Sequence, residues 1–83
     1  MKVKVLFFSV LQDVVGSPEI EYSLAAERSW TVAEVLADLY EKYEGLKIWD
    51  GKILLAVDQQ YADRGDLLQD GQELAIMPPV QGG

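Results

Sequence analysis

Residues 30–43 read WTVAEVLADLYEKY, and this stretch decides the fold class. Thr31 and Glu34 have the spacing of a capping box, while Trp30 and Val35 have the spacing of a hydrophobic staple. Apolar residues then recur at helical spacing and form one stripe: Val32, Val35, Leu36, Leu39, Tyr40 and Tyr43. The pattern predicts an amphipathic helix that ends at Gly45, with its aromatic residues packed in a core rather than forming a ligand cage.

Strand patterns surround this helix in the sequence. Lys2–Phe8 alternates and then becomes apolar, and Glu19–Leu24 alternates between polar and apolar residues. Ile53–Val57 is typical of a buried strand, and Glu73–Met77 is predicted as the last strand, with an irregular stretch expected between them. After the first strand, Ser9 and Gln12 predict a capping box for a short helix that stops at Gly16 and has Val10, Leu11, Val14 and Val15 on one face.

One helix with a single apolar stripe and several strands favours a mixed sheet packed on that helix, an α+β layer. The 83-residue length predicts one domain and suits a ubiquitin-like β-grasp. We expect this domain to occupy residues 1–79 and residues 80–83 to form an extended tail.

Composition excludes several kinds of chemistry. The chain contains no Cys and no His, which rules out disulfides, Cys/His metal sites and triad nucleophiles or bases. Its net charge of −7 disfavours nucleic acid and anionic membranes. No apolar run is long enough for a membrane span, and no signal-peptide pattern begins the sequence, so we expect a cytoplasmic protein.

The last six residues read PPVQGG. Pro78 and Pro79 lack backbone N–H donors, so strand pairing is expected to stop there and the chain to leave the body in a stiff segment. The four residues after them reach about 13 Å when fully extended. Gly82 and Gly83 carry no Cβ and could enter a narrow channel, where an enzyme could reach the final carboxylate. The alternative is that the glycines are a frayed end or a cloning remnant.

Several segments together resemble the small subunit of molybdopterin synthase, a sulfur carrier of the ubiquitin-like β-grasp type. They are residues 2–8 with the helix ending at Gly16, Leu55–Gln59, Leu68–Ala75 and Pro78–Gly83, of which the terminal PPVQGG is the most specific. Asp58 departs from the family pattern, in which Asn is frequent, but Asp is an equally good turn former.

The resemblance implies a reaction cycle in which this chain is a co-substrate rather than an enzyme by itself. A ubiquitin-activating-type (E1-like) enzyme adenylates Gly83 with ATP and magnesium, and a sulfur donor converts the adenylate to a thiocarboxylate. The charged tail, with Gly82 beside the reactive residue, then enters the large synthase subunit. There it gives sulfur to the pyranopterin precursor to form the dithiolene of molybdopterin. No permanently bound cofactor or metal is expected.

The resemblance also implies which residues contact the partners: Phe8, Tyr61, Met77, Pro78, Pro79, Val80 and Gln81. An exposed aromatic such as Tyr61 often anchors an interface, and Met77 suits an adaptable apolar contact. For Phe8, an ordinary core position is an equal alternative.

Other functions of this fold stay open. Related carriers serve thiamine synthesis, tRNA thiolation or amino-acid synthesis, and thiazole-type carriers usually lack the Pro-Pro-Val run. A conjugating modifier would form isopeptide bonds through Gly83, and a binding module would not need Gly83 at all.

Overall fold

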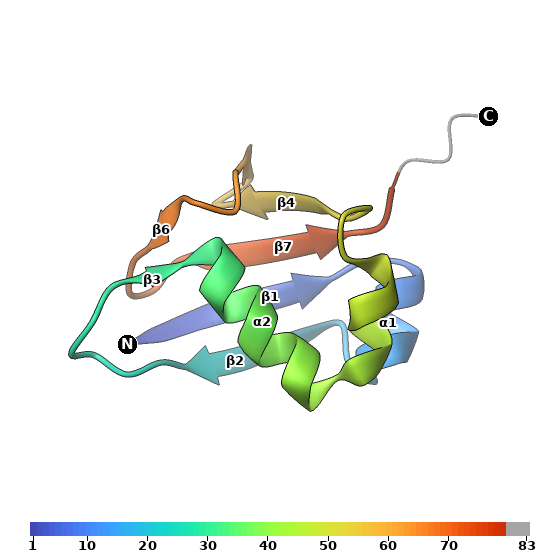
Figure 1. The fold of residues 1–83 in the computed structure, drawn as a ribbon, viewed down its shortest axis with the longest axis horizontal. Helices are drawn as coiled ribbons and strands as arrows, with labels where there is room; N and C mark the ends of the chain where they lie inside the picture. Colours follow the sequence, from blue (N-terminus) through green and yellow to red (C-terminus); the bar gives the residue numbers. More distant parts are fainter. Residues whose placement is uncertain (80–83) are drawn as a thin grey trace.

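The computed structural model describes residues 1–79, whose elements follow the predicted order with short additions. They are β1 (Lys2–Phe7), α1 (Val10–Val15), β2 (Glu19–Ser23), β3 (Trp30–Thr31), α2 (Val32–Lys42), the 3₁₀ helix η1 (Glu44–Trp49), β4 (Leu54–Val57), β5 (Gln60–Tyr61), β6 (Leu67–Leu68) and β7 (Glu73–Met77). The main sheet has the order β2-β1-β7-β4-β5, and α2 lies across one of its faces (Figure 1).

The sheet is mixed because β7, near the C-terminus, lies between β1, near the N-terminus, and β4. Strand β7 runs parallel to β1 and antiparallel to β4, while β1 and β2 are antiparallel neighbours. A parallel pair needs a long crossover, and the segment that contains α2 supplies it. The α+β layer and the β-grasp topology predicted from the sequence are therefore confirmed.

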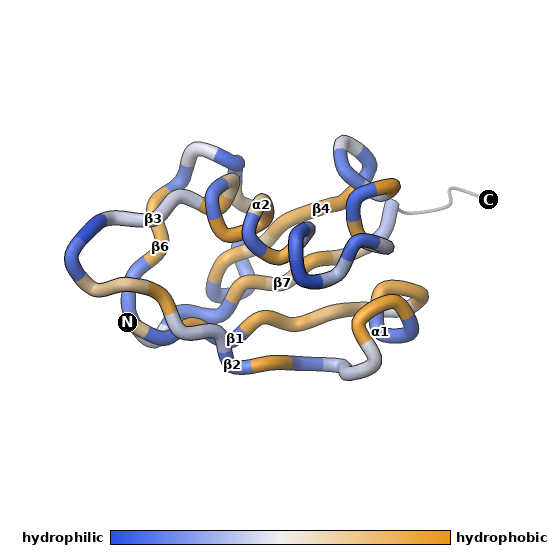
Figure 2. The backbone as a smooth tube through the Cα atoms, turned by 60° about the horizontal axis from the view of Figure 1, so that its bottom comes forward, coloured by the Kyte–Doolittle hydropathy of each residue, from blue (hydrophilic) through white to orange (hydrophobic). Residues whose placement is uncertain are grey.

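The core lies between α2 and the facing side of the sheet. On β1, Val3, Val5 and Phe7 are at most 1% exposed, whereas the alternate residues Lys2 and Lys4 are exposed. The helix contributes the buried part of its predicted stripe: Val32, Val35, Leu36 and Leu39. In Figure 2 the central strands β1, β7 and β4 are coloured mainly as hydrophobic. Burial of each such large side chain stabilises the fold by about 1.5–3 kcal/mol.

The predicted start of α2 is confirmed by its capping box. The Glu34 N–H donates to Thr31 Oγ1 at 3.2 Å, and the Thr31 N–H donates to Glu34 Oε1 at 2.9 Å. Trp30, Tyr40 and Tyr43 are half-buried against the core, which confirms packing as their role.

The predicted end of α2 is wrong. The helix ends at Lys42, and Gly45 lies inside η1, which buries Leu46. A Cβ on Gly45 would stand 2.9 Å from Val14 Cγ1, so this glycine allows η1 to approach α1 closely rather than ending a helix.

The short helix α1 is confirmed, but its predicted capping box is not. Ser9 has a φ of 56°, and its side chain makes no capping hydrogen bond; its backbone carbonyl accepts the Gln12 N–H at 3.0 Å instead. Gly16 ends the helix with a φ of 87°, as predicted. Leu11 is fully buried, Val14 and Val15 are half-buried, and Val10 is exposed.

The stretch between β4 and β7 is more regular than predicted. Strand β5 pairs with β4 through a tight hairpin in which Asp58 and Gln59 both have positive φ values, of 48° and 70°. Strand β6 pairs with β3 in a second, two-stranded sheet. Two-residue strands are too short to show a period of two, so the sequence pattern did not reveal them.

Two tyrosines make the stability of this fold sensitive to alkaline pH. Burial, followed by the hydrogen bond that Tyr40 donates to Asp50 at 2.7 Å, raises the pKa of Tyr40 to about 12. Burial and the hydrogen bond to Asp38 also raise the pKa of Tyr22. A raised pKa in the folded state gives stability that is complete below the unfolded value of 10 and is lost as the pH rises toward 12.

We therefore expect the urea concentration at the unfolding midpoint to decrease as the pH is raised from 10 to 12. Tyr40→Phe should reduce the slope of the urea midpoint against pH, because it removes one of the two tyrosines whose pKa is raised. Equal slopes for the wild type and Tyr40→Phe would contradict the assignment to Tyr40.

Candidate functional site

The outer face, meaning the side of the sheet that points away from α2, carries an apolar surface. Because strand residues alternate between faces, Leu74 and Ile76 of β7 enter the core while Glu73, Ala75 and Met77 point outward. In the strand register, Ala75 lies opposite Leu6 of β1 on one side and Ala56 of β4 on the other. The outward residues of three neighbouring strands thus form one continuous surface.

This surface is hollowed into an open pocket of about 370 Å³, here called the outer pocket. Its lining residues come from β1, β4, β5, β7 and the turns that follow β1 and β4: Leu6, Phe8, Ala56, Gln59, Tyr61, Glu73, Ala75 and Met77. The pocket brings together Phe8, Tyr61 and Met77, three of the residues predicted to contact a partner. Their partner-binding role itself remains a prediction.

Phe8 belongs to this surface and not to the core. The strand ends at Phe7, and the Phe8 N–H donates to the Ile76 carbonyl at 3.3 Å, which holds the residue beside β7. The Phe8 side chain is 42% exposed, so the alternative of an ordinary core position is wrong.

Tyr61 is the most exposed of the large hydrophobic side chains that stand out on residues 1–79, with 82% of its surface accessible. It lies opposite Ala56 in the β4–β5 pairing and lines three adjoining hollows at this edge of the sheet. An exposed aromatic ring beside an apolar pocket is typical of a binding anchor.

The outer pocket also lies where the chain leaves the sheet. Met77 is both the last residue of β7 and part of the pocket lining, and Pro78 and Pro79 follow it as half-buried residues. The predicted site residues Val80, Gln81, Gly82 and Gly83 lie outside the described residues 1–79, and so does the predicted tail 80–83. A partner bound at the outer pocket would therefore lie next to Pro78 and Pro79, where the chain leaves the sheet.

The sequence prediction missed five lining residues, namely Leu6, Ala56, Gln59, Glu73 and Ala75. The alternation of Glu73, Ala75 and Met77 would have placed β7 residues on the outer face. Their convergence with Leu6 and Ala56 depends on the strand order, which the sequence does not state.

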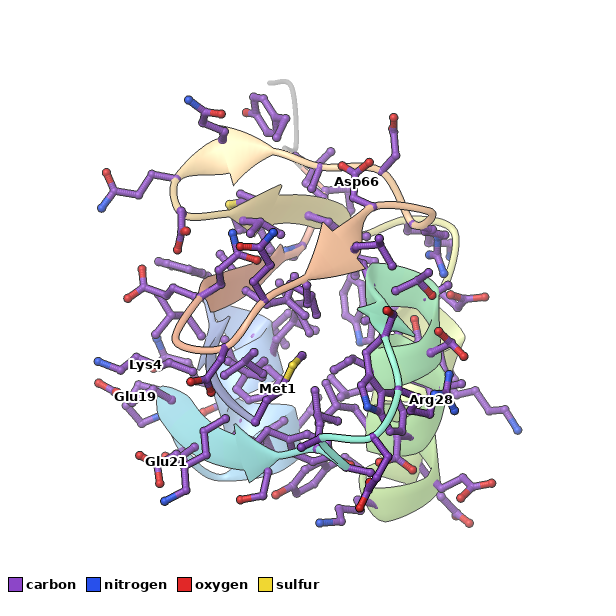
Figure 3. The ribbon with its side chains drawn as sticks, turned by 90° about the vertical axis from the view of Figure 1, so that its left-hand side faces the viewer. Met1, Lys4, Glu19, Glu21, Arg28 and Asp66 are labelled. Carbon is purple, nitrogen blue, oxygen red and sulfur yellow. The ribbon has the colours of Figure 1, made fainter. Side chains whose placement is uncertain are left out.

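Charged residues limit the apolar surface on one side. On β1 and β2, Lys2 pairs with Glu21 at 3.4 Å and Lys4 pairs with Glu19 at 3.6 Å. Figure 3 shows Lys4, Glu19 and Glu21 pointing away from α2 into solvent. Exposed pairs of this kind contribute about 0–1 kcal/mol each, so they keep this half of the outer face hydrated rather than stabilising it strongly.

Asp58 fixes the hairpin that presents Tyr61. Its carboxylate accepts the Glu73 N–H at 3.0 Å and the Gln72 Nε2–H at 3.2 Å, and its own N–H donates to the Glu73 carbonyl at 2.9 Å. These contacts join the β4–β5 turn to the start of β7.

We expect Asp58→Ala to lower the free energy of unfolding by about 1–2 kcal/mol, because it removes side-chain hydrogen bonds at a left-handed position that Ala disfavours. Asp58→Asn should change it by less than about 0.5 kcal/mol, since Asn keeps an acceptor and tolerates positive φ. Urea unfolding of both variants measures the difference, and equal losses would contradict a role for the acceptor oxygen.

Two other features are absent from the described part of the chain. Residues 1–79 contain no group of three or more Cys, His, Asp or Glu side chains placed to hold a metal ion. No helix among the same residues has the length and apolar character that crossing a lipid bilayer requires.

The matching family model and the similar curated proteins point to the same family. The model of the ThiS family matches residues 5–83. The molybdopterin synthase sulfur carrier subunit of Caenorhabditis briggsae is 38% identical, in an alignment covering 100% of this chain and 99% of that protein.

Two solved structures share the fold over the whole chain. The small archaeal modifier protein 1 of Methanosarcina acetivorans has a TM-score of 0.79 and 30% identity, covering 99% of this chain and 96% of that one. A complex of subunits 1 and 2 of the molybdopterin-converting factor from Helicobacter pylori contains a chain with a TM-score of 0.70 and 27% identity, with 100% of both chains covered.

Proposed function

This chain belongs to the ThiS family, and from that premise we propose that it is the sulfur carrier subunit of a molybdopterin synthase. The observation that carries the proposal is the end-to-end similarity to a subunit of that name, at 38% identity. The outer pocket supports it, because an apolar surface at the root of the C-terminal segment is where a partner that uses this segment would bind.

The proposed chemistry takes place on the terminal carboxylate of Gly83. Attack of this carboxylate on ATP, with magnesium, forms an acyl-adenylate and releases pyrophosphate. A sulfur donor then displaces AMP and leaves a thiocarboxylate. The sulfur attacks a carbon of the pyranopterin precursor and displaces the oxygen substituent there. Water then hydrolyses the acyl–sulfur bond, so the sulfur stays on the product and the carboxylate on Gly83 is restored. Two such transfers, from two charged chains, supply the two sulfurs of the dithiolene.

This cycle needs no Cys or His from the carrier, in agreement with a sequence that has neither. The thiocarboxylate itself is the nucleophile, and the groups that activate and transfer it belong to the partners. Gly82 lets the segment fit a narrow channel because it has no side chain.

The proposed partners are an E1-like activating enzyme and the large subunit of the synthase, with the precursor bound by the latter. The structure from Helicobacter pylori pairs a similar chain with a second subunit, which supports a two-subunit assembly. We place the large subunit on the outer pocket, where Phe8, Tyr61 and Met77 are grouped.

A second candidate function is protein conjugation, because the chain is also 30% identical to a small archaeal modifier protein. A modifier would end its cycle with a lysine amine attacking the carbonyl of the Gly83 adenylate or thiocarboxylate, which forms an isopeptide bond and releases AMP or sulfide. Both functions share the activation step, so only the acceptor separates them.

Intact and C-terminal peptide mass spectrometry tests the proposal. The chain is incubated with the activating enzyme, ATP, magnesium and a sulfur source, and then with a thiol alkylating agent. An ATP-dependent alkyl adduct on the peptide ending at Gly83 supports the carrier. Alkylation separates sulfur from oxidation of Met1 or Met77, and the absence of Cys removes competing adducts. Isopeptide-linked products without an adduct would favour the modifier.

A further inference from the structure

Glu73 is the one carboxylate among the residues that line the outer pocket. It lies on β7 and points to the same side as Ala75 and Met77, and it is only partly exposed. The pocket contains no Lys or Arg, and its remaining lining is apolar apart from Gln59 and the Tyr61 hydroxyl. A surface of this composition carries a local negative charge inside an apolar setting.

No cation among residues 1–79 forms a salt bridge with Glu73. Lys4 lies opposite Glu73 in the β1–β7 register, but its amine pairs with Glu19 at 3.6 Å. Lys2, the next cation on β1, pairs with Glu21. In the free protein the Glu73 carboxylate therefore depends on water for its solvation.

A partner that covers the outer pocket removes this water. Moving an unpaired carboxylate out of water costs several kcal/mol unless an opposite charge replaces the solvent. Apolar contacts with Phe8, Tyr61 and Met77 attract the partner, but they cannot solvate a charge. The charge of Glu73 therefore restricts which apolar partner surfaces can bind, since a surface without a cation would pay the desolvation cost in full.

We infer that Glu73 is a specificity-determining residue that pairs with an Arg or Lys side chain of the large synthase subunit when that subunit covers the outer pocket. This inference rests on the proposed function and adds to it the chemistry of the contact. The Glu73 backbone is held independently by Asp58 through the contacts described above. A change confined to the side chain thus tests the charge without disturbing the turn.

Glu73→Gln tests the pairing, and Glu21→Gln is its matched control. Both substitutions remove one negative charge from an outward strand position, but Glu21 lies on the hydrated half of the outer face. Binding of the large subunit is measured by calorimetry at two salt concentrations, and urea midpoints verify folding. We expect Glu73→Gln to weaken binding by about 30-fold, because the partner's cation would be buried unpaired, and Glu21→Gln to change it by less than about twofold.

The changes in affinity for the large subunit show whether Glu73 pairs with a cation of the partner. Unchanged or tighter binding by Glu73→Gln would overturn the inference, because it would mean that no partner cation faces Glu73 or that Lys4 turns to neutralise it. Equal weakening by both variants would also overturn it and would indicate only long-range attraction. If the wild-type chain does not bind the large subunit at all, the proposed function fails, and the inference fails with it.

Discussion

A chain that lacks Gly83 should support molybdopterin formation at least about 10²-fold less well than the full chain, because its terminal carboxylate is about 3.3 Å short of the reacting position. Adding one residue after Gly83 should have a comparable effect, since it displaces the carboxylate in the other direction. Neither change touches a residue of the core, so the urea midpoint should stay the same.

Gly82→Val should give the same loss if the C-terminal segment must enter a narrow channel, because a branched side chain widens the segment next to the reactive carbon. Gly65→Val is the matched control. A Cβ at Gly65 meets no atom within 4 Å, and its φ lies outside the left-handed region. The assay measures product formation with the activating enzyme, sulfur source, large subunit and precursor all present. Undiminished product with Gly82→Val would contradict the narrow-channel argument.

Met77→Glu should abolish stable binding of the large subunit, with a loss of affinity of about 10²–10³-fold. The substitution places a charge within the proposed contact, because Met77 lines the outer pocket at the end of β7. An uncompensated charge buried at an interface costs about 3–5 kcal/mol, and each 1.4 kcal/mol corresponds to a factor of ten.

Ser23→Glu is the control for Met77→Glu. It adds the same charge to an exposed, outward position of β2, away from the outer pocket. Met77 does not pack against the core cluster, so the free energy of unfolding of both variants should stay within about 0.5 kcal/mol of the wild-type value. Calorimetric titration with the large subunit measures the affinities. Equal effects of the two variants would show that net charge rather than contact decides binding.

The elements that the sequence predicted well are those with a long, regular pattern. The capping box of Thr31 and Glu34 and the stripe from Val32 to Leu39 identify α2, because an eleven-residue helix displays its period three times. The alternation of β1 and the apolar run of β7 likewise predict strands that exist.

The errors occur where a tertiary contact overrides a local signal. Gly45 is a typical helix stop in sequence, but the packing of Leu46 converts the segment into a 3₁₀ helix and places Gly45 against Val14. Ser9 and Gln12 have capping-box spacing, yet the positive φ of Ser9 turns its side chain away from the cap. Strand pairing, not sequence period, creates β5 and β6.

The candidate site was predictable only in part, for a physical reason. Phe8, Tyr61 and Met77 could be named from the family resemblance, but their grouping arises from the parallel pairing of β7 with β1 and the antiparallel pairing with β4. Glu73 gives no signal of its own in the sequence, because an acidic residue at the start of a strand is ordinary. Its place in the mainly apolar lining of the outer pocket appears only once the strand order is known.

The most direct test of sulfur transfer starts from a chain already charged at its end. A chain carrying a thiocarboxylate on Gly83 is mixed with the large subunit and the pyranopterin precursor, without ATP. Molybdopterin is then measured, together with the mass of the C-terminal peptide. The account predicts that product appears in proportion to the thiocarboxylate consumed, while the peptide returns to the mass of the carboxylate. A thiocarboxylate that persists beside unchanged precursor, or that ends in an isopeptide bond, would contradict it.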